Sequence, residues 1–359
     1  MKNYSLIIVL FFLSLSLSAQ TKADMMLDFM IKNKNNFSIF LQKNDTAIAA
    51  YNENKLMPLA STVKIIVAIE FAKQAAAHVI EVGDAVSLAD LNKYYLPNTD
   101  GGAHPAWLKY EQKQKHVFND SINLIDVARG MILFSSNANT EYLVDLLGLD
   151  NINNDIPMLG IKKHTSIFPM VASLYLYQNP RNIAEKKLIK GITSLNEEEY
   201  CRFTYDIHKA LKYNDSLKAR FRPQDLTMPM QRVWSERLPA STTSDYVHVA
   251  KIINNRKFLS KEAYEILARV LESVMESPGN KKLFQHAGTK GGSTTWVLTK
   301  TLYATLLNGD RIEVAYFFNN LQPEQQTNLQ SWMNSFELEV LTNENFRTKL
   351  KNAFPLAIK

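Results

Sequence analysis

The sequence predicts an α/β (α+β) fold, in which an antiparallel sheet of about five strands is built from both ends of the chain and flanked by helices. Two hairpin patterns and one helical stretch carry this prediction. Near the N-terminus, FSIFLQ and TAIAAY flank Lys43-Asn44-Asp45. Near the C-terminus, WVLTKTLYATLL and RIEVAYFF flank Asn308-Gly309-Asp310, a strong hairpin signal. The stretch between the hairpins, from residue 61 to about 240, is mainly helical in pattern and predicts an inserted all-helical domain.

The other elements follow from apolar periodicity. Residues 22 to 34 (KADMMLDFMIKNK) are typical of an amphipathic helix, and the apolar run after Lys64 is typical of a buried one. The segment from Gln322 onward is also expected to be helical. Two helices have predicted core-facing side chains, which are Leu143, Leu146 and Leu147 in the first and Leu329, Trp332, Met333 and Phe336 in the second.

The first 19 residues are typical of a secretory signal peptide. They contain Lys2, the apolar core IIVLFFLSLSL and the small residue Ala19 before Gln20. The apolar run is too short for a membrane span, and no later stretch approaches the roughly 20 apolar residues that a span needs. No cysteine stands at the cleavage point to carry a lipid anchor. We therefore expect a secreted, periplasmic protein without stable membrane insertion.

The remaining chain divides into two predicted domains. Residues 20 to 60 and 241 to 359 are expected to form the sheet domain. Residues 61 to 240 are expected to form the helical domain, with an extra helical insertion near residues 180 to 235. The hydrophobic share of 46% in 359 residues is sufficient for a substantial core.

Composition excludes several classes of function. The net charge of +6 is modest for this length, and the sequence has no dense Lys/Arg patch interleaved with aromatics, which argues against a nucleic-acid partner. A single cysteine, Cys201, excludes an intramolecular disulfide. The seven histidines show no metal-ligand spacing. We expect a monomer that acts on a small molecule, with no metal and no cofactor.

Ser61 and Lys64 form the one Ser-x-x-Lys of the chain, directly before the apolar run. Residues three apart share a helix face, so the Ser61 hydroxyl and the Lys64 amine are expected to meet near the helix N-terminus. Apolar surroundings and the helix dipole both lower the pKa of Lys64, which lets the neutral amine accept the serine proton. The alternative is a Ser N-cap followed by a surface lysine, and so short a pattern alone favours that reading.

Two later motifs change this balance. Ser135-Ser136-Asn137 opens an amphipathic helix, and Lys290-Gly291-Gly292 precedes a strand-like stretch. Ser-x-Asn is weak on its own, because it also begins at residues 121 and 194, whereas Lys-x-Gly occurs once. The ordered set of three motifs is the arrangement found in class A β-lactamases and penicillin-binding proteins.

The chain resembles this superfamily beyond the motifs. KLMPLASTVKIIVAIEFAKQ looks like the family's nucleophile helix, and FSSNANTEYLVDLLGLDNINNDIPMLGIKKHT is similar to the second motif and the helix pair after it. LPASTTSDYVHVAKIINNRKFLSKEAYEIL resembles the family's Thr-Thr-x-x-Asp helix. The resemblance covers most of the chain, with gaps near residues 90 to 116 and 180 to 235, and implies the β-lactamase/DD-peptidase fold.

The resemblance also implies a role for each motif residue. Ser61 would be the acylated nucleophile and Lys64 its base. Ser135 would pass the proton to the leaving group, and Asn137 would hold the substrate's amide oxygen and help to position Lys64. Lys290 would lower the pKa of Lys64 and Ser135 and attract an anionic substrate.

The same resemblance implies the substrate contacts. The backbone N–H groups of Ser61 and Ser293 would form the oxyanion hole. Gly291, Gly292, Ser293 and Thr294 would line the substrate site, and we expect Tyr95 to join them from the loop predicted over residues 90 to 116.

Two departures from the family pattern bear on function. The class A enzymes carry a Glu-x-x-Leu-Asn loop whose glutamate activates the deacylating water, and the corresponding stretch here, SIFPMVASLYLYQNP, has no acid. Glu197, Glu198 and Glu199 are better explained by a helix capping box that begins at Asn196. The second departure is Gly291, where the family usually has Thr or Ser to bind a substrate carboxylate. Either neighbouring hydroxyls take over this role, or the substrate lacks that carboxylate.

Three functions remain open from the sequence. The first is an exported serine hydrolase, acylated on Ser61 by a β-lactam or a related amide or ester. The second is a peptidoglycan D-Ala-D-Ala carboxypeptidase or penicillin-binding protein, which the missing glutamate favours and Gly291 disfavours. The third is a non-catalytic sensor of cell-wall fragments or antibiotics, and retention of the complete motif set argues against it.

Overall fold

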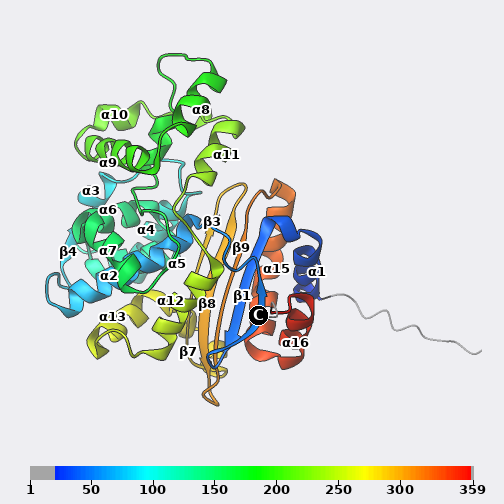
Figure 1. The fold of residues 1–359 in the computed structure, drawn as a ribbon. Coiled ribbons are helices and arrows are strands. Elements are labelled where there is room, and N and C mark those ends of the chain that lie inside the picture. Colours follow the sequence, from blue (N-terminus) through cyan, green and yellow to red (C-terminus); the bar gives the residue numbers. More distant parts are fainter. Residues whose placement is uncertain (1–20, 357–359) are drawn as a thin grey trace, which may run out of the picture.

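A computed structural model of the chain describes residues 21–356. The expected signal peptide, residues 1 to 19, lies outside the described residues. Among the helices of the described part, none combines the length and apolar character that a membrane span requires. Figure 1 shows a sheet with helices on both faces and a group of further helices at one end of the molecule.

Five antiparallel strands form the central sheet in the order β2-β1-β9-β8-β7. The strands are β1 (Phe37–Lys43), β2 (Thr46–Tyr51), β7 (Phe284–Ser293), β8 (Leu298–Leu306) and β9 (Arg311–Phe318). Both predicted hairpins are present, and pairing of β1 with β9 joins the two ends of the chain in one sheet. The predicted fold class is therefore confirmed.

One face of the sheet is covered by helices from the chain ends (Figure 1). These are α1 (Lys22–Lys32), α15 (Pro323–Thr342) and α16 (Glu344–Ala353). Aromatic rings fill the space between them and the sheet, as where Phe336 meets Tyr316 edge to face at 5.4 Å. The residues predicted to face the core in α15 do so, with Leu329, Met333 and Phe336 buried and Trp332 partly buried.

The other face carries α12, which packs on the sheet, and beyond it lies a helical layer around α2. The first part of α2 is apolar on nearly all sides, and it is buried among its neighbours, as expected for a central helix. In the helix α6, Leu143 and Leu147 are buried, but Leu146 is 40% exposed and does not join the core. The helices of this layer are α2 (Lys64–Ala76), α5 (Leu124–Leu133), α6 (Asn137–Leu147), α7 (Leu149–Met158), α12 (Thr243–Asn255) and α13 (Lys261–Leu271).

Short elements connect these layers. Two small ladders pair β3 (Met57–Pro58) with β6 (Ala240–Ser241) and β4 (Ala85–Ser87) with β5 (Ser121–Asn123). The short helices are α3 (Leu88–Asn92), α14 (Pro278–Lys281) and the 3-10 turns η1 (Lys34–Asn36), η2 (Ala60–Val63), η3 (Ala172–Tyr177), η4 (Pro223–Asp225) and η5 (Ser273–Glu276).

The segment from residue 90 to 116 is not the continuous loop that its Pro and Gly residues predicted. A helix, α4 (Ala103–Gln114), begins directly after Gly102, which has a φ of 84°. Pro105 lies in the first turn, where backbone N–H groups have no intrahelical partner and proline costs little. Trp107 from this helix is fully buried.

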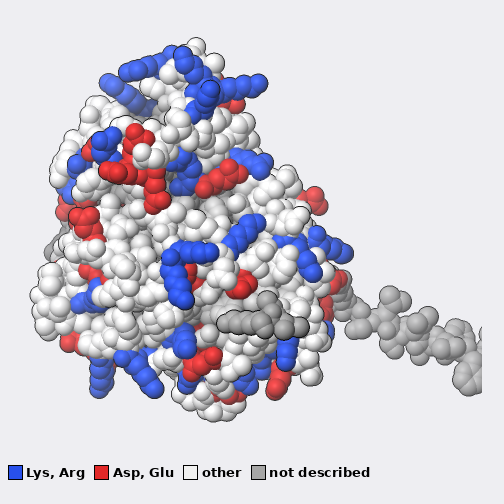
Figure 2. Space-filling view, in the orientation of Figure 1, with Lys and Arg blue, Asp and Glu red and all other residues white. Residues whose placement is uncertain are grey.

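The predicted insertion is helical and forms the end of the molecule that stands above the sheet in Figure 1. It consists of α8 (Glu185–Thr193), α9 (Glu197–Tyr213), α10 (Asp215–Ala219) and α11 (Met228–Glu236). The capping box between Asn196 and Glu199 is present at the start of α9, as predicted. Figure 2 shows Lys and Arg side chains gathered over this end of the molecule.

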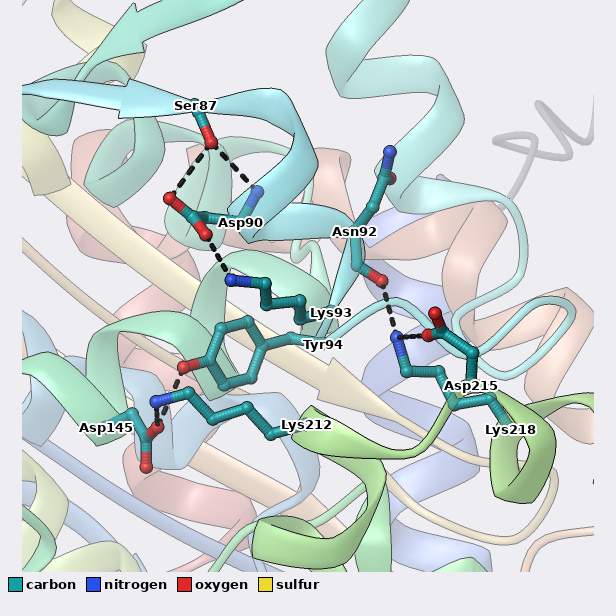
Figure 3. A network of polar contacts seen from close by, with 9 residues as sticks. All are labelled: Ser87, Asp90, Asn92, Lys93, Tyr94, Asp145, Lys212, Asp215 and Lys218. Atoms are coloured by element: carbon teal, nitrogen blue, oxygen red, sulfur yellow. Dashed lines mark hydrogen bonds and ion pairs between the residues drawn. The ribbon is translucent and has the colours of Figure 1, made fainter.

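Polar contacts fasten the insertion to the helical layer (Figure 3). Lys212 of α9 lies 2.5 Å from the Asp145 carboxylate of α6, and the Tyr94 hydroxyl donates to the same oxygen at 2.7 Å. Lys218 of α10 donates to the carbonyl of Asn92. These contacts place the insertion against α6, the helix that begins with Asn137.

A buried histidine strengthens this junction. His208 of α9 has its Nδ1 2.8 Å from Glu141 and its Nε2 3.1 Å from Asp145. Burial lowers the pKa of His208, but the two carboxylates outweigh this effect and raise it to about 9. The imidazolium therefore bridges two acids of α6 at neutral pH.

Candidate active site

The turn that carries Ser61 is fixed by the sheet. Residues 60 to 63 form a 3-10 turn, entered through Ala60 with a φ of 46°. Thr299 of β8 donates to the carbonyl of Leu59, and its hydroxyl lies 2.8 Å from that of Thr62. The side chain of Ser61 is thereby held at the junction of the sheet and the helical layer.

Lys64 is the first residue of α2, and its side chain is fully buried. Its ammonium nitrogen donates to the carbonyl of Ser135 at 2.7 Å, to the Asn137 amide oxygen at 2.8 Å and to the Ser135 hydroxyl at 3.4 Å. Burial lowers the pKa of Lys64 to about 7, although the charges of Asp100 and Glu141 oppose this shift. A substantial share of neutral amine is thus present at neutral pH.

The direct contact expected between Ser61 and Lys64 is not formed. In the described part of the chain, the hydrogen bonds of the Lys64 amine go to Ser135 and Asn137 instead. The reason is the local geometry, because Ser61 belongs to a 3-10 turn and the regular α-helix begins only at Lys64. The lysine reaches across to the start of α6.

Ser135 has a strained backbone. Its φ of 65° lies in the left-handed region, which is unusual for a residue with a side chain. The next residue, Ser136, is the N-cap of α6, and its hydroxyl accepts the N–H of Asn139. The buried ring of His104 lies 3.0 Å from the same hydroxyl. This fixed cap holds Ser135 in the conformation that turns its carbonyl and hydroxyl toward Lys64.

Lys290 of β7 completes the polar chain. Its ammonium donates to the Ser135 hydroxyl at 3.0 Å and to the carbonyl of Gly291 at 2.7 Å. Burial holds the pKa of Lys290 well below its usual range, and the charges of Lys64 and Lys300 lower it further. Ser135 therefore stands between two buried lysines whose pKa values are both lowered.

Gly292 brings the strand β7 against the Ser61 turn. A methyl group at this position would lie 2.4 Å from the backbone nitrogen of Ser61 and 2.6 Å from the carbonyl oxygen of Leu59. No side chain fits there without a shift of backbone. Glycine is thus what allows the end of β7, with Ser293, to lie directly beside the Ser61 N–H.

The residues after Lys290 differ in how their hydroxyls are held. The Thr294 hydroxyl accepts the N–H groups of Trp296 and Val297 within its own turn, at 3.3 and 3.2 Å. Ser293 is exposed. Gly291 has no side chain, and a methyl group at its Cβ position would lie 3.2 Å from Lys300 of β8.

A cavity of about 720 Å³ brings most of the expected residues together. Lys64 and Lys290 do not line this cavity, but both donate to the hydroxyl of Ser135, which does. The expected residues that line it are Ser61, Ser135, Asn137, Gly291, Gly292, Ser293 and Thr294. Much of the remaining wall is apolar and includes Phe134, Met170, Val171, Leu174, Trp234, Leu238, Trp296 and Met333.

The stretch that corresponds to the class A glutamate loop forms part of this apolar wall. Met170, Val171 and Leu174 face the cavity. The N–H of Val171 donates to the Glu141 carboxylate, and the indole N–H of Trp234 donates to Ser173. Residues 166 to 180 therefore present no acid to the cavity, as the sequence predicted.

Tyr95 lies elsewhere. Its ring packs against His104 at 4.8 Å, outside the residues that line the cavity. The same segment contributes Asn98, Thr99, Asp100 and Gly101 to the cavity wall instead. These four residues and the insertion's Trp234 had no periodic or motif signal in the sequence.

One group of residues has the composition of a metal site. Ligand atoms of Glu111, His116 and Asp126 lie within 4.8 Å of one another. The His116 ring is already 2.7 Å from the Glu111 carboxylate, and the indole of Trp107 donates to the other oxygen. None of these four residues is among those that line the cavity.

Comparison with known proteins identifies the family and the fold of the chain. The protein family described as "Beta-lactamase enzyme family" matches residues 23–286. The match covers well over half of the chain, so this protein belongs to the beta-lactamase enzyme family. No curated protein matches it.

Solved structures share the fold at low sequence identity. A class A beta-lactamase from Bacteroides cellulosilyticus is 16% identical with a TM-score of 0.52, covering 92% of this chain and 96% of that one. A beta-lactamase from Chitinophaga pinensis is 13% identical with a TM-score of 0.52, covering 88% and 99%. A variant of PBP-A, in an acyl-enzyme complex with penicillin G, is 15% identical with a TM-score of 0.50, covering 88% and 95%. At such identities these structures establish the fold alone.

Proposed function

We propose that this protein is an exported serine hydrolase that is acylated on Ser61 by a β-lactam or a related amide or ester and then hydrolyses the acyl-enzyme. The observation that carries the proposal is the hydrogen-bonded chain from Lys64 through Ser135 to Lys290, in which Ser135 lines the same cavity as Ser61. Activation of a serine nucleophile requires a base that is unprotonated at working pH, and burial of Lys64 favours its unprotonated, neutral amine.

Acylation uses these groups in order. Neutral Lys64 takes the Ser61 proton as the hydroxyl oxygen attacks the carbonyl carbon. Because the amine contacts Ser135 and Asn137 in this structure, this step requires the Ser61 and Lys64 side chains to approach each other when substrate binds. The oxyanion is held by the N–H groups of Ser61 and Ser293, whose approach depends on Gly292. Ser135 then donates its proton to the leaving nitrogen or oxygen, and it can recover a proton from either lysine that contacts it.

Hydrolysis of the acyl-enzyme is expected to be slow on β-lactams. The residues in the place of the class A glutamate loop are Met170, Val171 and Leu174 where they face the cavity. Apolar side chains neither orient nor deprotonate a water molecule. A slow second step would let the covalent adduct accumulate.

Export to the periplasm is part of the same proposal. It is supported by the apolar run and Ala19 of the first 19 residues, which are typical of a cleaved signal peptide.

Intact-mass spectrometry tests the proposal. The purified protein is mixed with a penicillin and a cephalosporin and sampled from seconds to hours, beside Ser61→Ala and Ser135→Ala. Ser121→Ala is the matched control, because Ser121 begins another Ser-x-Asn that lies outside the residues lining the cavity. We expect an adduct that needs Ser61, forms slowly without Ser135 and is unaffected at Ser121.

The fate of the adduct separates the remaining functions. Slow clearance with release of hydrolysed drug supports the hydrolase. An adduct that persists through hours points to a penicillin-binding protein instead. If no adduct forms with either drug, acylation by β-lactams is contradicted.

A further inference from the structure

Asp100 is the charged group of the cavity wall. Of the described residues that line this cavity, it is the only one with a side chain that is charged at neutral pH. Lys64 and Lys290 lie behind Ser135 rather than on the wall, and burial lowers the pKa of both. A substrate that enters therefore meets one full negative charge.

The Asp100 carboxylate is held in a fixed position. One oxygen accepts the N–H of Gly102 at 3.1 Å, and the other accepts the N–H of His104 at 2.9 Å, at the start of α4. Each carboxylate oxygen can accept more than one hydrogen bond, so capacity remains on both. The side chain is half-buried, which limits screening by water.

This carboxylate has no cationic partner of its own. None of the ion pairs formed by residues 21–356 includes Asp100. Its charge instead acts across the site and opposes the lowering of the Lys64 pKa. A positively charged group of a ligand would satisfy it.

The opposite requirement, a site for a substrate carboxylate, is met by no cationic side chain among the described residues of the cavity wall. Gly291 has no hydroxyl, and the Thr294 oxygen is held by two N–H groups of its own turn, which leaves the Ser293 hydroxyl and the Thr294 O–H as neutral donors. The nearby Lys300 ammonium lies 3.5 Å from Glu337, which offsets its charge. The balance of charge on the cavity wall favours cationic substrates over anionic ones.

We propose that Asp100 is a binding residue for a protonated amine, and that the cavity selects amide or ester substrates that carry an ammonium group on the acyl side chain. The proposal rests on the proposed acylation of Ser61 and adds the substrate class. The ammonium donates to Asp100 while the apolar wall contacts the rest of the acyl group. Charge-assisted hydrogen bonds of this kind discriminate by about 10- to 150-fold, and we expect the lower end of this range because Asp100 is only half-buried.

Ampicillin and benzylpenicillin provide a matched test, because they differ by one amino group on the acyl side chain. Second-order acylation rate constants are measured by intact mass for the protein, Asp100→Asn and Asp90→Asn. We expect ampicillin to react about tenfold faster than benzylpenicillin, and the preference to disappear in Asp100→Asn. Asparagine keeps one oxygen that can accept a backbone N–H, which limits damage to the start of α4.

The control variant removes the same charge elsewhere. Asp90 also lies near the start of a helix, where its carboxylate accepts a hydrogen bond from the Ser87 hydroxyl. It lies outside the residues that line the cavity. Asp90→Asn should keep the ampicillin preference. If Asp100→Asn lowers the acylation rate constants of both drugs equally, so that the ratio of ampicillin to benzylpenicillin is unchanged, the carboxylate only caps α4 and the proposal is overturned. Equal rates for the two drugs in the unmodified protein also overturn it.

A binding measurement separates failure of this proposal from failure of the proposed function. The affinity of Ser61→Ala for both drugs is measured by calorimetry, which needs no acylation. If Ser61→Ala binds ampicillin more tightly, Asp100→Asn removes that preference, and the unmodified protein forms no adduct, the amine site is supported and the hydrolase is contradicted. Equal affinities contradict the amine site whatever the acylation result.

Discussion

The Lys64 ammonium lies 2.7 Å from the carbonyl oxygen of Ser135, a residue whose φ of 65° turns that carbonyl toward it. The contact replaces the expected one between Lys64 and Ser61. A strained backbone at Ser135 thus serves to hold the buried lysine, and the cap at Ser136 stabilises the strained conformation. Lys64 is positioned by the second motif more than by the first.

The pH dependence of acylation tests the role of Lys64. Only the neutral amine accepts a proton, and burial lowers its pKa to about 7. The acylation rate constant should therefore rise with pH and level off above an apparent pKa near 7. Stopped-flow or intact-mass rates from pH 5 to 9 measure this profile.

Lys64→Arg is the matched variant for this prediction. Arginine keeps the positive charge but does not deprotonate in proteins. Loss of the general base typically costs about 10² to 10⁴ in rate. The rise of the acylation rate constant with pH should therefore disappear in this variant. If Lys64→Arg keeps both the acylation rate constant and its rise with pH, another group is the base.

Gly292→Ala should slow acylation through a local shift of backbone, while the overall fold is retained. The added methyl would lie 2.4 Å from the Ser61 nitrogen, so β7 or the Ser61 turn must move. Displacement of one oxyanion-hole donor costs about 10² to 10³ in rate. The rate is measured by adduct formation and the fold by circular dichroism.

Gly191→Ala is the control for that substitution. Gly191 lies in α8, and a methyl group there has nothing within 4 Å. In a helix interior, replacement of Gly by Ala stabilises the folded protein by up to about 1 kcal/mol. Acylation should be unchanged at Gly191, and equal losses at both positions would remove the steric explanation.

The sequence was most informative where a local pattern decides the structure. Asn308-Gly309 specifies a hairpin by turn geometry alone, and the capping box at Asn196 is fixed within four residues. The motifs at Ser61 and Ser135 were found for the same reason, since each is a short string. Their meeting in one cavity depends on the fold and was supplied by the resemblance.

The segment around Asp100 shows where such reasoning failed. Pro97, Gly101, Gly102 and Pro105 indicated a loop, but a helix begins after Gly102 because a proline is tolerated in the first turn. Asp100 and Trp234 enter the cavity from regions without a motif. Their positions depend on tertiary packing, which no local periodicity encodes.

The missing hydroxyl at Gly291 predicts tolerance of neutral substrates. With no side chain at this position, a substrate carboxylate gains little over its methyl ester. Benzylpenicillin and its methyl ester should therefore acylate the protein at rates within about threefold of each other. A strong preference for the acid would contradict this prediction.

Gly291→Ser and Gly291→Ala form the matched pair for that test. Both add a Cβ that lies 3.2 Å from Lys300, so both require the same small adjustment. Serine alone adds a hydroxyl that can donate to the substrate carboxylate. This hydrogen bond should raise the acylation rate of the free acid about tenfold relative to its methyl ester. Only Gly291→Ser should prefer the free acid.

His208 should stabilise the junction between the insertion and α6 in a pH-dependent way. Its pKa is raised in the folded protein to about 9, from an ordinary value of 6.5. A raised pKa contributes stability that is fully present below the unfolded value and is lost as pH rises through the folded one. The contribution is therefore complete below about pH 6.5, declines between 6.5 and 9, and is absent above. The shift corresponds to a free energy on the order of 3 kcal/mol.

Urea denaturation of the protein and of His208→Gln at several pH values between 6 and 10 measures this contribution. The difference in unfolding free energy should be large at pH 6 and should shrink as the pH approaches 9. His78→Gln is the control, because the His78 side chain is 66% exposed and its nearest ion-pair contact is to the exposed Glu81. A difference at His208 that does not change with pH would mean that the ring stabilises the junction by packing, since the packing of a neutral ring does not titrate over this range.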